Sequence, residues 1–167
     1  EVSVVIPEYN GIAFLDSVLA SLEGQTLKNF EVIFVDNGSS EEAVLSLRAI
    51  IGVHIIELPE NYGFCKAVNE GIKASRAPYV LLLNNDTEVK EDFLEEMVAA
   101  IRRHKRAFSC AARMVQYHDR DRLDDAGNFY NALGWSLREQ GRDIHTYEKE
   151  NRYFPPDGGA ADLQKKI

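Results

Sequence analysis

The sequence predicts an α/β fold with a mostly parallel central sheet and crossover helices. Short apolar runs alternate four times with segments whose apolar residues recur at helical spacing. The runs are continuously apolar, which is typical of strands buried on both faces of a parallel sheet. The connections are short, as in sheets built from right-handed crossovers. With 167 residues, of which 45% are hydrophobic, the chain is long enough for about one domain with its own core.

The first strand and helix are marked by a change of apolar pattern. A β-branched run over residues 2–6 predicts a strand that ends at Pro7. Helical spacing follows, and this helix is expected to start at Asn10 or Gly11 and to stop at Gly24. Its apolar face is expected to consist of Ile12, Leu15, Val18, Leu19 and Leu22.

The second and third strands enclose the next helix. Residues 32–35 predict a strand that ends in the polar turn 36–40, and residues 53–58 predict the third strand. Ser39 or Ser40 is suited to cap the intervening helix, because a serine hydroxyl accepts a hydrogen bond from a first-turn N–H. The apolar face of this helix is expected to be Val44, Leu47, Ile50 and Ile51.

Small residues distinguish the third helix, which follows a loop at 61–63. It is predicted to pack closely on the sheet through Ala67, Val68, Gly71, Ile72 and Ser75. The fourth strand is predicted at 79–83 and a fifth at 107–115. The helix between these two strands has its apolar stripe at Phe93, Leu94, Met97, Val98 and Ile101.

The regular pattern weakens after about Tyr117. Residues 119–125 are strongly charged, and residues 155–159 contain the prolines and glycines of a loop. A further element is expected to begin at 160–163.

Three polar clusters follow three of the predicted strands, at residues 8–10, 36–37 and 84–86. In open parallel sheets, ligands bind beyond the carboxyl ends of the strands. The sequence therefore predicts one binding site where these clusters meet.

Composition argues against several classes of protein. The 19 basic and 27 acidic residues give a net charge of −8, so we expect no nucleic-acid partner. The longest apolar runs, such as 79–83, are far shorter than the ~20 residues that cross a bilayer.

Neither a leader-like segment nor a methionine opens the sequence, so an excised domain is expected. The two cysteines lie far apart and are expected to be reduced thiols, and the four histidines show no metal-ligand spacing.

The usual glycine-rich phosphate loops are missing from the sequence. Neither a GxGxxG nor a GxxxxGK[ST] pattern follows the first strand. If a nucleotide binds, a divalent cation is the expected partner of its diphosphate, because Mg²⁺ is typically held by one or two carboxylates together with substrate phosphates. Asp86, at the end of a buried strand, is the candidate carboxylate.

Four ordered motifs resemble family 2 glycosyltransferases over about residues 2–101. Residues 2–10 (VSVVIPEYN) resemble the opening strand and residues 30–40 (FEVIFVDNGSS) the second strand. Residues 61–72 resemble the asparagine-glycine segment, and 79–86 (YVLLLNND) the strand that ends in the metal-binding DxD motif. The sequences NNDT and LDDAG look most like the bacterial rhamnosyltransferase branch of this family.

The resemblance implies a GT-A fold, a Rossmann-like three-layer sandwich, and a Mg²⁺ or Mn²⁺ cofactor. It implies inverting transfer of a sugar from a UDP- or dTDP-sugar to a saccharide or lipid-linked acceptor in surface polysaccharide synthesis. The expected location is the cytoplasm, with peripheral association of the full-length protein at the inner face of the membrane left open.

The resemblance also assigns roles to residues. Asp36 would accept the imide N–H of uracil or thymine, Lys66 would reach the diphosphate, and Asp86 would hold the metal against both phosphates. The complete donor-binding set is Pro7, Glu8, Tyr9, Asn10, Asp36, Lys66, Asn69 and Asn85, with Asp86 as the metal ligand.

The sequence departs from the family pattern at two places. Asn84 replaces the first aspartate of DxD, which removes one carboxylate from the expected metal site. The catalytic base is expected beyond Ile167, because the pair at 124–125 comes too early for the family's Glu-Asp motif. We therefore expect residues 1–115 to form the donor-binding half and residues 116–167 an incomplete start of the acceptor side. An incomplete acceptor side would leave an edge of the sheet uncovered, and such an edge is compatible with pairing of two chains into a homodimer.

Each site residue also has a structural interpretation. Asp36 suits a turn or helix cap, and Asp86 suits the N-cap of a helix that starts near Lys90. Lys66 suits a solvated helix position, Asn69 a cap or backbone bridge, and Glu8 a solvent-facing position.

Three other functions compete with sugar transfer. A signalling receiver domain would use Asp36 as phospho-acceptor, but it needs an acidic pair after the first strand, where only Glu8 is present, and a lysine at a later strand end. A non-catalytic nucleotide-sugar or saccharide binding module remains open for this chain. A sugar-nucleotide pyrophosphorylase would need a glycine-rich, arginine-containing opening loop, which is absent.

Overall fold

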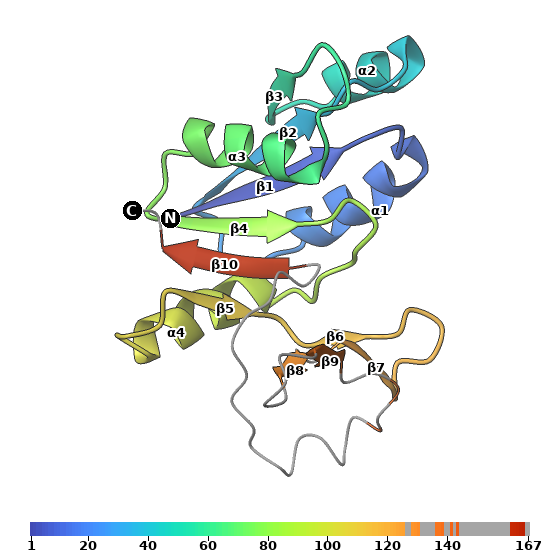
Figure 1. Ribbon diagram of the computed structural model, residues 1–167. Helices are drawn as coiled ribbons and strands as arrows, with labels where there is room; N and C mark the ends of the chain where they lie inside the picture. The colour runs from blue at the N-terminus through green and yellow to red at the C-terminus, as the bar shows by residue number, and fades with distance from the viewer. Residues whose placement is uncertain (126–127, 131–135, 139–140, 142, 144–160, 166–167) are drawn as a thin grey trace.

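A computed structural model describes residues 1–125, 128–130, 136–138, 141, 143 and 161–165. Within these residues, six strands form one sheet in the order β3-β2-β1-β4-β10-β5 (Figure 1). β1, β2, β3 and β4 are mutually parallel, and β10 is antiparallel to both β4 and β5. The bounds are β1 Val2–Glu8, β2 Phe30–Asp36, β3 His54–Glu57, β4 Tyr79–Leu83, β5 Ser109–Ala111 and β10 Ala161–Lys165.

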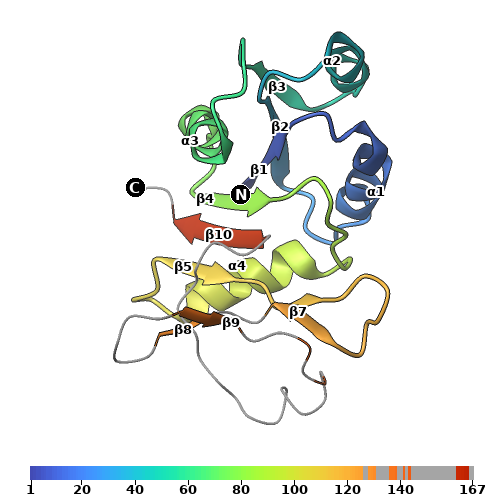
Figure 2. The ribbon, with the colours of Figure 1, turned by 45° about the vertical axis from the view of Figure 1, so that its right-hand side comes forward.

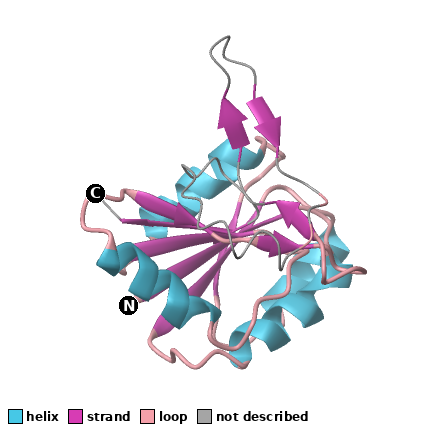
Figure 3. Cartoon of the chain, turned by 90° about the horizontal axis from the view of Figure 1, so that it is seen from below, coloured by secondary structure: helices cyan, strands magenta, loops and turns pink. Residues whose placement is uncertain are grey.

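Helices cover both faces of the sheet, which confirms the predicted α/β layering (Figures 2 and 3). α1 (Ile12–Glu23), α2 (Glu41–Arg48) and α4 (Phe93–Arg103) pack on one face, and α3 (Phe64–Ala74) packs on the other. The helices bury apolar residues against the strands, and α2 does so through Ala43 and Leu47. The expectation that Ile51 belongs to the apolar face of α2 is wrong, because the helix ends at Arg48 and Ile51 is 96% exposed. The first face contributes Val4, Ile6, Phe34, Leu81 and Leu83 to the core, and the second contributes Val5, Ile33, Val35 and Val80.

α3 lies unusually close to the sheet because Gly71 faces it. A Cβ added at Gly71 would collide with Val5 Cγ1 and would lie 3.1 Å from Val35 Cγ2. The expected close packing of the small-residue helix is therefore confirmed. This contact fixes α3, and with it the loop that precedes α3, against β1 and β2.

α4 begins later than residue 90, because a buried glutamine organises its start. The Gln25 side chain is fully buried, and its Oε1 accepts a hydrogen bond from Leu94 N–H at 2.9 Å. Its Nε2 donates to the carbonyl oxygen of Lys90 at 2.6 Å. Asp92 occupies the N-cap position of α4. The interpretation of Asp86 as the cap of this helix is therefore wrong.

The region after α4 differs from the predicted single strand at 107–115. It forms β5 and then β6 (Met114–Val115), which pairs with β7 (Leu123–Asp125). A second small sheet joins β8 (Asn128–Tyr130) to β9 (Ser136–Arg138). The expected loop at 155–159 lies outside the described residues.

β10 brings the end of the chain back into the main sheet, between β4 and β5. The element expected at 160–163 is thus a strand at 161–165. The division of the chain at residue 115 stays a prediction. Among the helices that the structure describes, each is too short or too polar to cross a lipid bilayer.

Candidate functional site

The carboxyl ends of three strands lie together at one edge of the sheet. β1 and β2 are in parallel register, with Glu8 opposite Asp36. β4 runs parallel to β1 on its other side, and residues 84–86 follow its last residue. β3 brings Glu57 opposite Asp36 from the far side. The predicted meeting of the three polar clusters is therefore confirmed.

Glu8 is buried at this edge, with 1% of its surface exposed. Its Oε1 accepts a hydrogen bond from Gly11 N–H, and its Oε2 accepts one from Asn85 Nδ2. The interpretation of Glu8 as a solvent-facing residue is therefore wrong. Both of its oxygens are engaged by protein donors from two different loops.

Asn10 joins the loop after β1 to the loop after β2. Its N–H donates to Ser39 Oγ at 3.0 Å, and its Oδ1 accepts from Ser40 N–H at 2.8 Å. The backbone of Asn10 is left-handed, with φ of 53°, a region in which asparagine is enriched. Ser40 also caps α2 by accepting from Ala43 N–H, as expected from the sequence.

Asn37 joins the loop after β2 to the loop after β3. It is 5% exposed, its Nδ2 donates to Asn61 Oδ1 at 3.0 Å, and its Oδ1 accepts from Tyr62 N–H at 3.0 Å. Asn61 Oδ1 also accepts from Gly63 N–H at 2.9 Å. Sequence reasoning placed Asn37 and Asn61 in motifs but assigned them no role. The sequence signal that could have identified them is that each lies one or two residues before a turn glycine, Gly38 or Gly63.

Asp36 lies at the centre of these loops and is 1% exposed. Ser39 N–H lies 3.3 Å from each of its carboxylate oxygens, so the turn interaction expected as an alternative is present. These contacts are long, and a carboxylate offers about four acceptor positions. Asp36 therefore retains the capacity to accept a hydrogen bond from a ligand.

Asp86 stands in a loop that is held on both sides. Asn85 is bound to Glu8, and Thr87 Oγ donates to the Asn84 carbonyl oxygen at 2.7 Å. Asp86 itself is exposed. Within the described residues, no hydrogen bond or ion pair engages its carboxylate, which is therefore available to a ligand.

Glu88 anchors the far end of the same loop. It accepts hydrogen bonds from Ser17 Oγ at 2.6 Å, Tyr117 OH at 3.0 Å and Arg120 Nη2 at 3.2 Å. The hydrogen bonds from Ser17 and Tyr117 hold the pKa of Glu88 below its ordinary value. The loop is thus tied to α1 and to the β6–β7 connection.

The metal donors at this edge are few. No group of three or more histidine, cysteine or acidic side chains gathers anywhere in the described part of the chain. Asp86 supplies one free carboxylate, and Asn84 offers an amide oxygen in place of a second. This set fits Mg²⁺ or Mn²⁺ that is completed by substrate phosphates, because one or two carboxylates suffice in such sites.

Lys66 and Asn69 lie on the exposed side of α3. Lys66 Nζ lies 2.7 Å from Glu70 Oε1, and Lys73 Nζ lies 2.9 Å from the same oxygen. The hydrogen bonds from Lys66 and Lys73 lower the pKa of Glu70 to about 2. The Lys66 side chain is thus engaged in an ion pair on the surface of α3.

The ion pairs of Glu70 predict an acid-sensitive contribution to stability. The pKa of Glu70 is about 2 in the folded chain and ordinarily 4.5, so its contribution is present above pH 4.5 and is lost as the pH falls toward 2. We expect Glu70→Gln to lower the free energy of unfolding at neutral pH, and this difference from the wild type to shrink across that window. Urea unfolding at stepped pH measures it, and a difference that does not change with pH would contradict the assignment.

Of the remaining predicted residues, Pro7 is half-buried within β1, whereas Tyr9 is 52% exposed in the loop that follows. Tyr62 and Phe64, from the loop before α3 and its first turn, are also exposed. Sequence reasoning did not assign Tyr62 to the site. The strand-end loops therefore carry exposed aromatic rings beside their buried polar groups.

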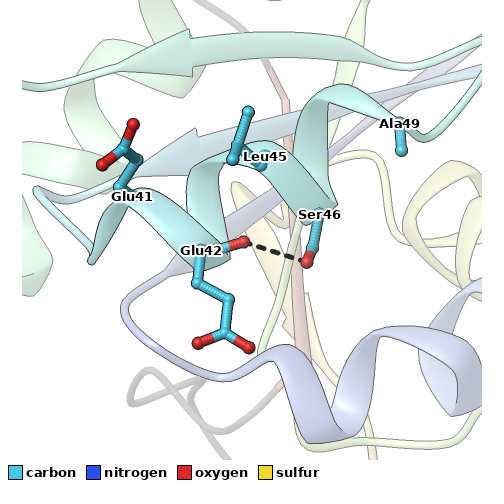
Figure 4. Close-up of a pocket in the computed structure, with 5 residues that line it drawn as sticks. All are labelled: Glu41, Glu42, Leu45, Ser46 and Ala49. Atoms are coloured by element: carbon cyan, nitrogen blue, oxygen red, sulfur yellow. Dashed lines mark hydrogen bonds between the residues drawn. The ribbon is translucent and has the colours of Figure 1, made fainter.

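A surface hollow also lies along the outer side of α2 (Figure 4). It is lined by Glu41, Glu42, Leu45, Ser46 and Ala49, all from this helix or its end. Ser46 Oγ donates to the Glu42 carbonyl oxygen at 3.0 Å within the helix. None of the predicted site residues lines this hollow, so it is separate from the strand-end site.

Comparison of this chain with known proteins finds glycosyltransferases. Residues 3–160 match the family model described as glycosyl transferase family 2. An uncharacterized glycosyltransferase of Haemophilus influenzae is 32% identical over 99 residues, which cover 59% of this chain and 34% of the relative. The putative teichuronic acid biosynthesis glycosyltransferase TuaG of Bacillus subtilis is 28% identical over 127 residues, which cover 74% of this chain and 50% of TuaG.

This chain also resembles a solved structure in both fold and sequence. S. aureus TarS 1–349 in complex with UDP-GlcNAc matches with a TM-score of 0.59 at 26% identity, covering 68% of this chain and 34% of that protein. The chain thus spans between 34% and 50% of the length of these three proteins.

Proposed function

We propose, because this chain belongs to glycosyl transferase family 2, that it forms the donor-binding part of an inverting enzyme that uses a UDP- or dTDP-sugar. The acceptor in this proposal is a saccharide or lipid-linked saccharide of the cell surface. The name of TuaG, which refers to teichuronic acid, and the UDP-GlcNAc bound by TarS support this choice. The full reaction, a cytoplasmic position at the membrane face and a homodimer are proposals for the whole protein.

The proposal rests on two carboxylates, Asp36 and Asp86, which lie at the same edge of the sheet in different surroundings. Asp36 is buried among hydrogen-bonded loops, where an acceptor can recognise the imide N–H of a uracil or thymine base. Asp86 is exposed beyond β4, which lies on the other side of β1 from β2, and a carboxylate there can hold a cation. One end of the edge thus suits a base and the other a diphosphate.

Asp86 would hold Mg²⁺ or Mn²⁺, with Asn84 beside it. The bound ion would stabilise the charge on the departing nucleoside diphosphate. Lys66 would add a cation from α3, and Asn69 and Asn85 would support the donor. The catalytic base is proposed to lie beyond Ile167.

The receiver-domain alternative has little support in the structure. The acidic partner that it needs, Glu8, has both carboxylate oxygens already engaged by N–H donors, and asparagines rather than a lysine follow β4. A non-catalytic nucleotide-sugar module remains the alternative for this length of chain. Transfer by the longer protein would decide between the two.

Calorimetric titration tests the proposed function. We expect UDP or dTDP to bind more tightly with Mn²⁺ than without it, and CDP, whose base has no ring N–H to donate to Asp36, to bind weakly in both cases. Asp86→Asn should lower the nucleotide affinity measured with Mn²⁺ about tenfold, as expected for the loss of one charged metal ligand. Asp92→Asn is the matched control, because Asp92 is exposed and makes no capping hydrogen bond. Absence of nucleotide binding in a folded sample would overturn the proposal.

A further inference from the structure

We propose that Glu8 is a positioning residue that locks the metal end of the donor site to its nucleoside end. This inference rests on the proposed function, and it gives Glu8 a role other than direct contact with the nucleotide. Its carboxylate would act through Asn85, the residue next to Asp86.

Glu8, Gly11 and Asn85 are packed into contact. Gly11 N–H donates to Glu8 Oε1, and Asn85 Nδ2 donates to Glu8 Oε2. A Cβ added at Gly11 would collide with Asn85 Nδ2 and would lie 2.9 and 3.2 Å from the two Glu8 oxygens. The space around this carboxylate is therefore filled by protein atoms.

The chemistry of the three groups requires a carboxylate at position 8. Both neighbours present N–H donors, and an ionised carboxylate accepts at both oxygens. A glutamine at position 8 has only one acceptor oxygen, so its NH₂ group would face a donor until the Asn85 amide rotated, and both hydrogen bonds would become neutral. Charge-assisted hydrogen bonds of this kind are stronger than neutral ones.

Glu8 also reaches the loop after β2 through its backbone. Asn37 N–H donates to the Glu8 carbonyl oxygen at 2.8 Å. One residue thus binds the loops that follow β1, β2 and β4. Its side chain provides the bond to the β4 loop, and Glu88 holds the other end of that loop. Asp86 lies between these two anchors.

The nucleoside end has hydrogen bonds that do not involve the Glu8 side chain. Asn10 binds Ser39 and Ser40, and Asn37 binds Asn61. Loss of the Glu8–Asn85 bond should therefore release the loop that carries Asp86 and leave the surroundings of Asp36 in place. The Mn²⁺-dependent part of UDP binding should fall, and binding of uridine, which has no phosphate, should not.

A donor–acceptor exchange tests this inference. Glu8→Gln removes the charge that both N–H donors face, and Asn85→Asp places carboxylate against carboxylate. The double variant Glu8→Gln/Asn85→Asp restores one donor and one acceptor with the net charge of the wild type. Calorimetry with UDP plus Mn²⁺, calorimetry with uridine, and thermal unfolding are measured on all four proteins.

We expect each single variant to bind UDP about tenfold more weakly than the wild type in the presence of Mn²⁺. The double variant should regain most of this affinity. Uridine affinity should stay within about threefold throughout, a change below one neutral hydrogen bond. Lack of rescue while the wild type binds UDP would overturn the positioning role alone. A parallel loss of uridine binding would show a purely structural role and overturn it too. A wild type that binds no UDP would overturn both this inference and the proposed function.

Discussion

Replacement of Asp36 by asparagine is expected to weaken UDP binding about 10- to 100-fold, the range for loss of a charge-assisted hydrogen bond. Asparagine keeps the size of the side chain, and its Oδ1 can still accept the hydrogen bond of Ser39 N–H. The turn should therefore be retained, while the charged acceptor for the base is lost. Calorimetry at saturating Mn²⁺ measures the change.

Asp16→Asn is the control for this experiment, because Asp16 is an exposed aspartate on α1. It should bind UDP like the wild type. If Asp36→Asn is folded and binds UDP within about twofold of the wild type, a change well below one hydrogen bond, then Asp36 is only a turn residue.

Replacement of Gly38 by alanine is expected to lower the free energy of unfolding by about 3 kcal/mol or more. Gly38 has φ of +77°, a left-handed conformation that costs an alanine energy. An added Cβ would also lie 2.6 Å from Glu60 Cα and 2.7 Å from Asn61 N. Backbone atoms cannot move aside easily, so the two loops around Asp36 would be forced apart. Urea unfolding measures the loss.

Gly52 provides a matched control for the steric part of this effect. It has φ of +83°, and a Cβ added there would meet nothing within 4 Å. Gly52→Ala should therefore show the backbone cost alone, about 1 kcal/mol. Equal losses for the two variants would contradict the close packing of the loops after β2 and β3.

The core of the fold follows from local sequence patterns. Continuous apolar runs predicted the four parallel strands, and helical spacing predicted the four helices that cover them. β1, β2 and β3 follow one another in the sequence and in the sheet, whereas β4 lies on the other side of β1. The meeting of Asp36 and Asp86 at one edge could be predicted because both follow parallel strands.

The place of β10 could not be predicted in this way. Its pairing with β4 and β5 joins residues that are far apart in the sequence, and the pattern of one strand does not identify its partner. The start of α4 depends likewise on Gln25, a residue of the α1–β2 connection. Long-range hydrogen bonds decide both features.

The bonds within the site were also hidden from the sequence. Glu8 reads as a polar residue at a strand end, and only the folded chain shows that Gly11 and Asn85 surround it. Asn37 and Asn61 share a hydrogen bond across two loops, which residue type alone does not indicate. The residue types proposed to bind a ligand stand out in the sequence, whereas the hydrogen bonds that hold their loops in place do not.

In the proposed donor site, the diphosphate end lies at Asp86. Paramagnetic broadening of backbone amide NMR signals by Mn²⁺, with UDP present, tests it most directly. Signals of residues 84–87 and 9–11 should weaken first, those of Val2 and Phe30 at the opposite ends of the strands should persist, and Asp86→Asn should remove the effect. Broadening centred on Glu41 and Glu42 of α2, or unchanged in the variant, would contradict the account.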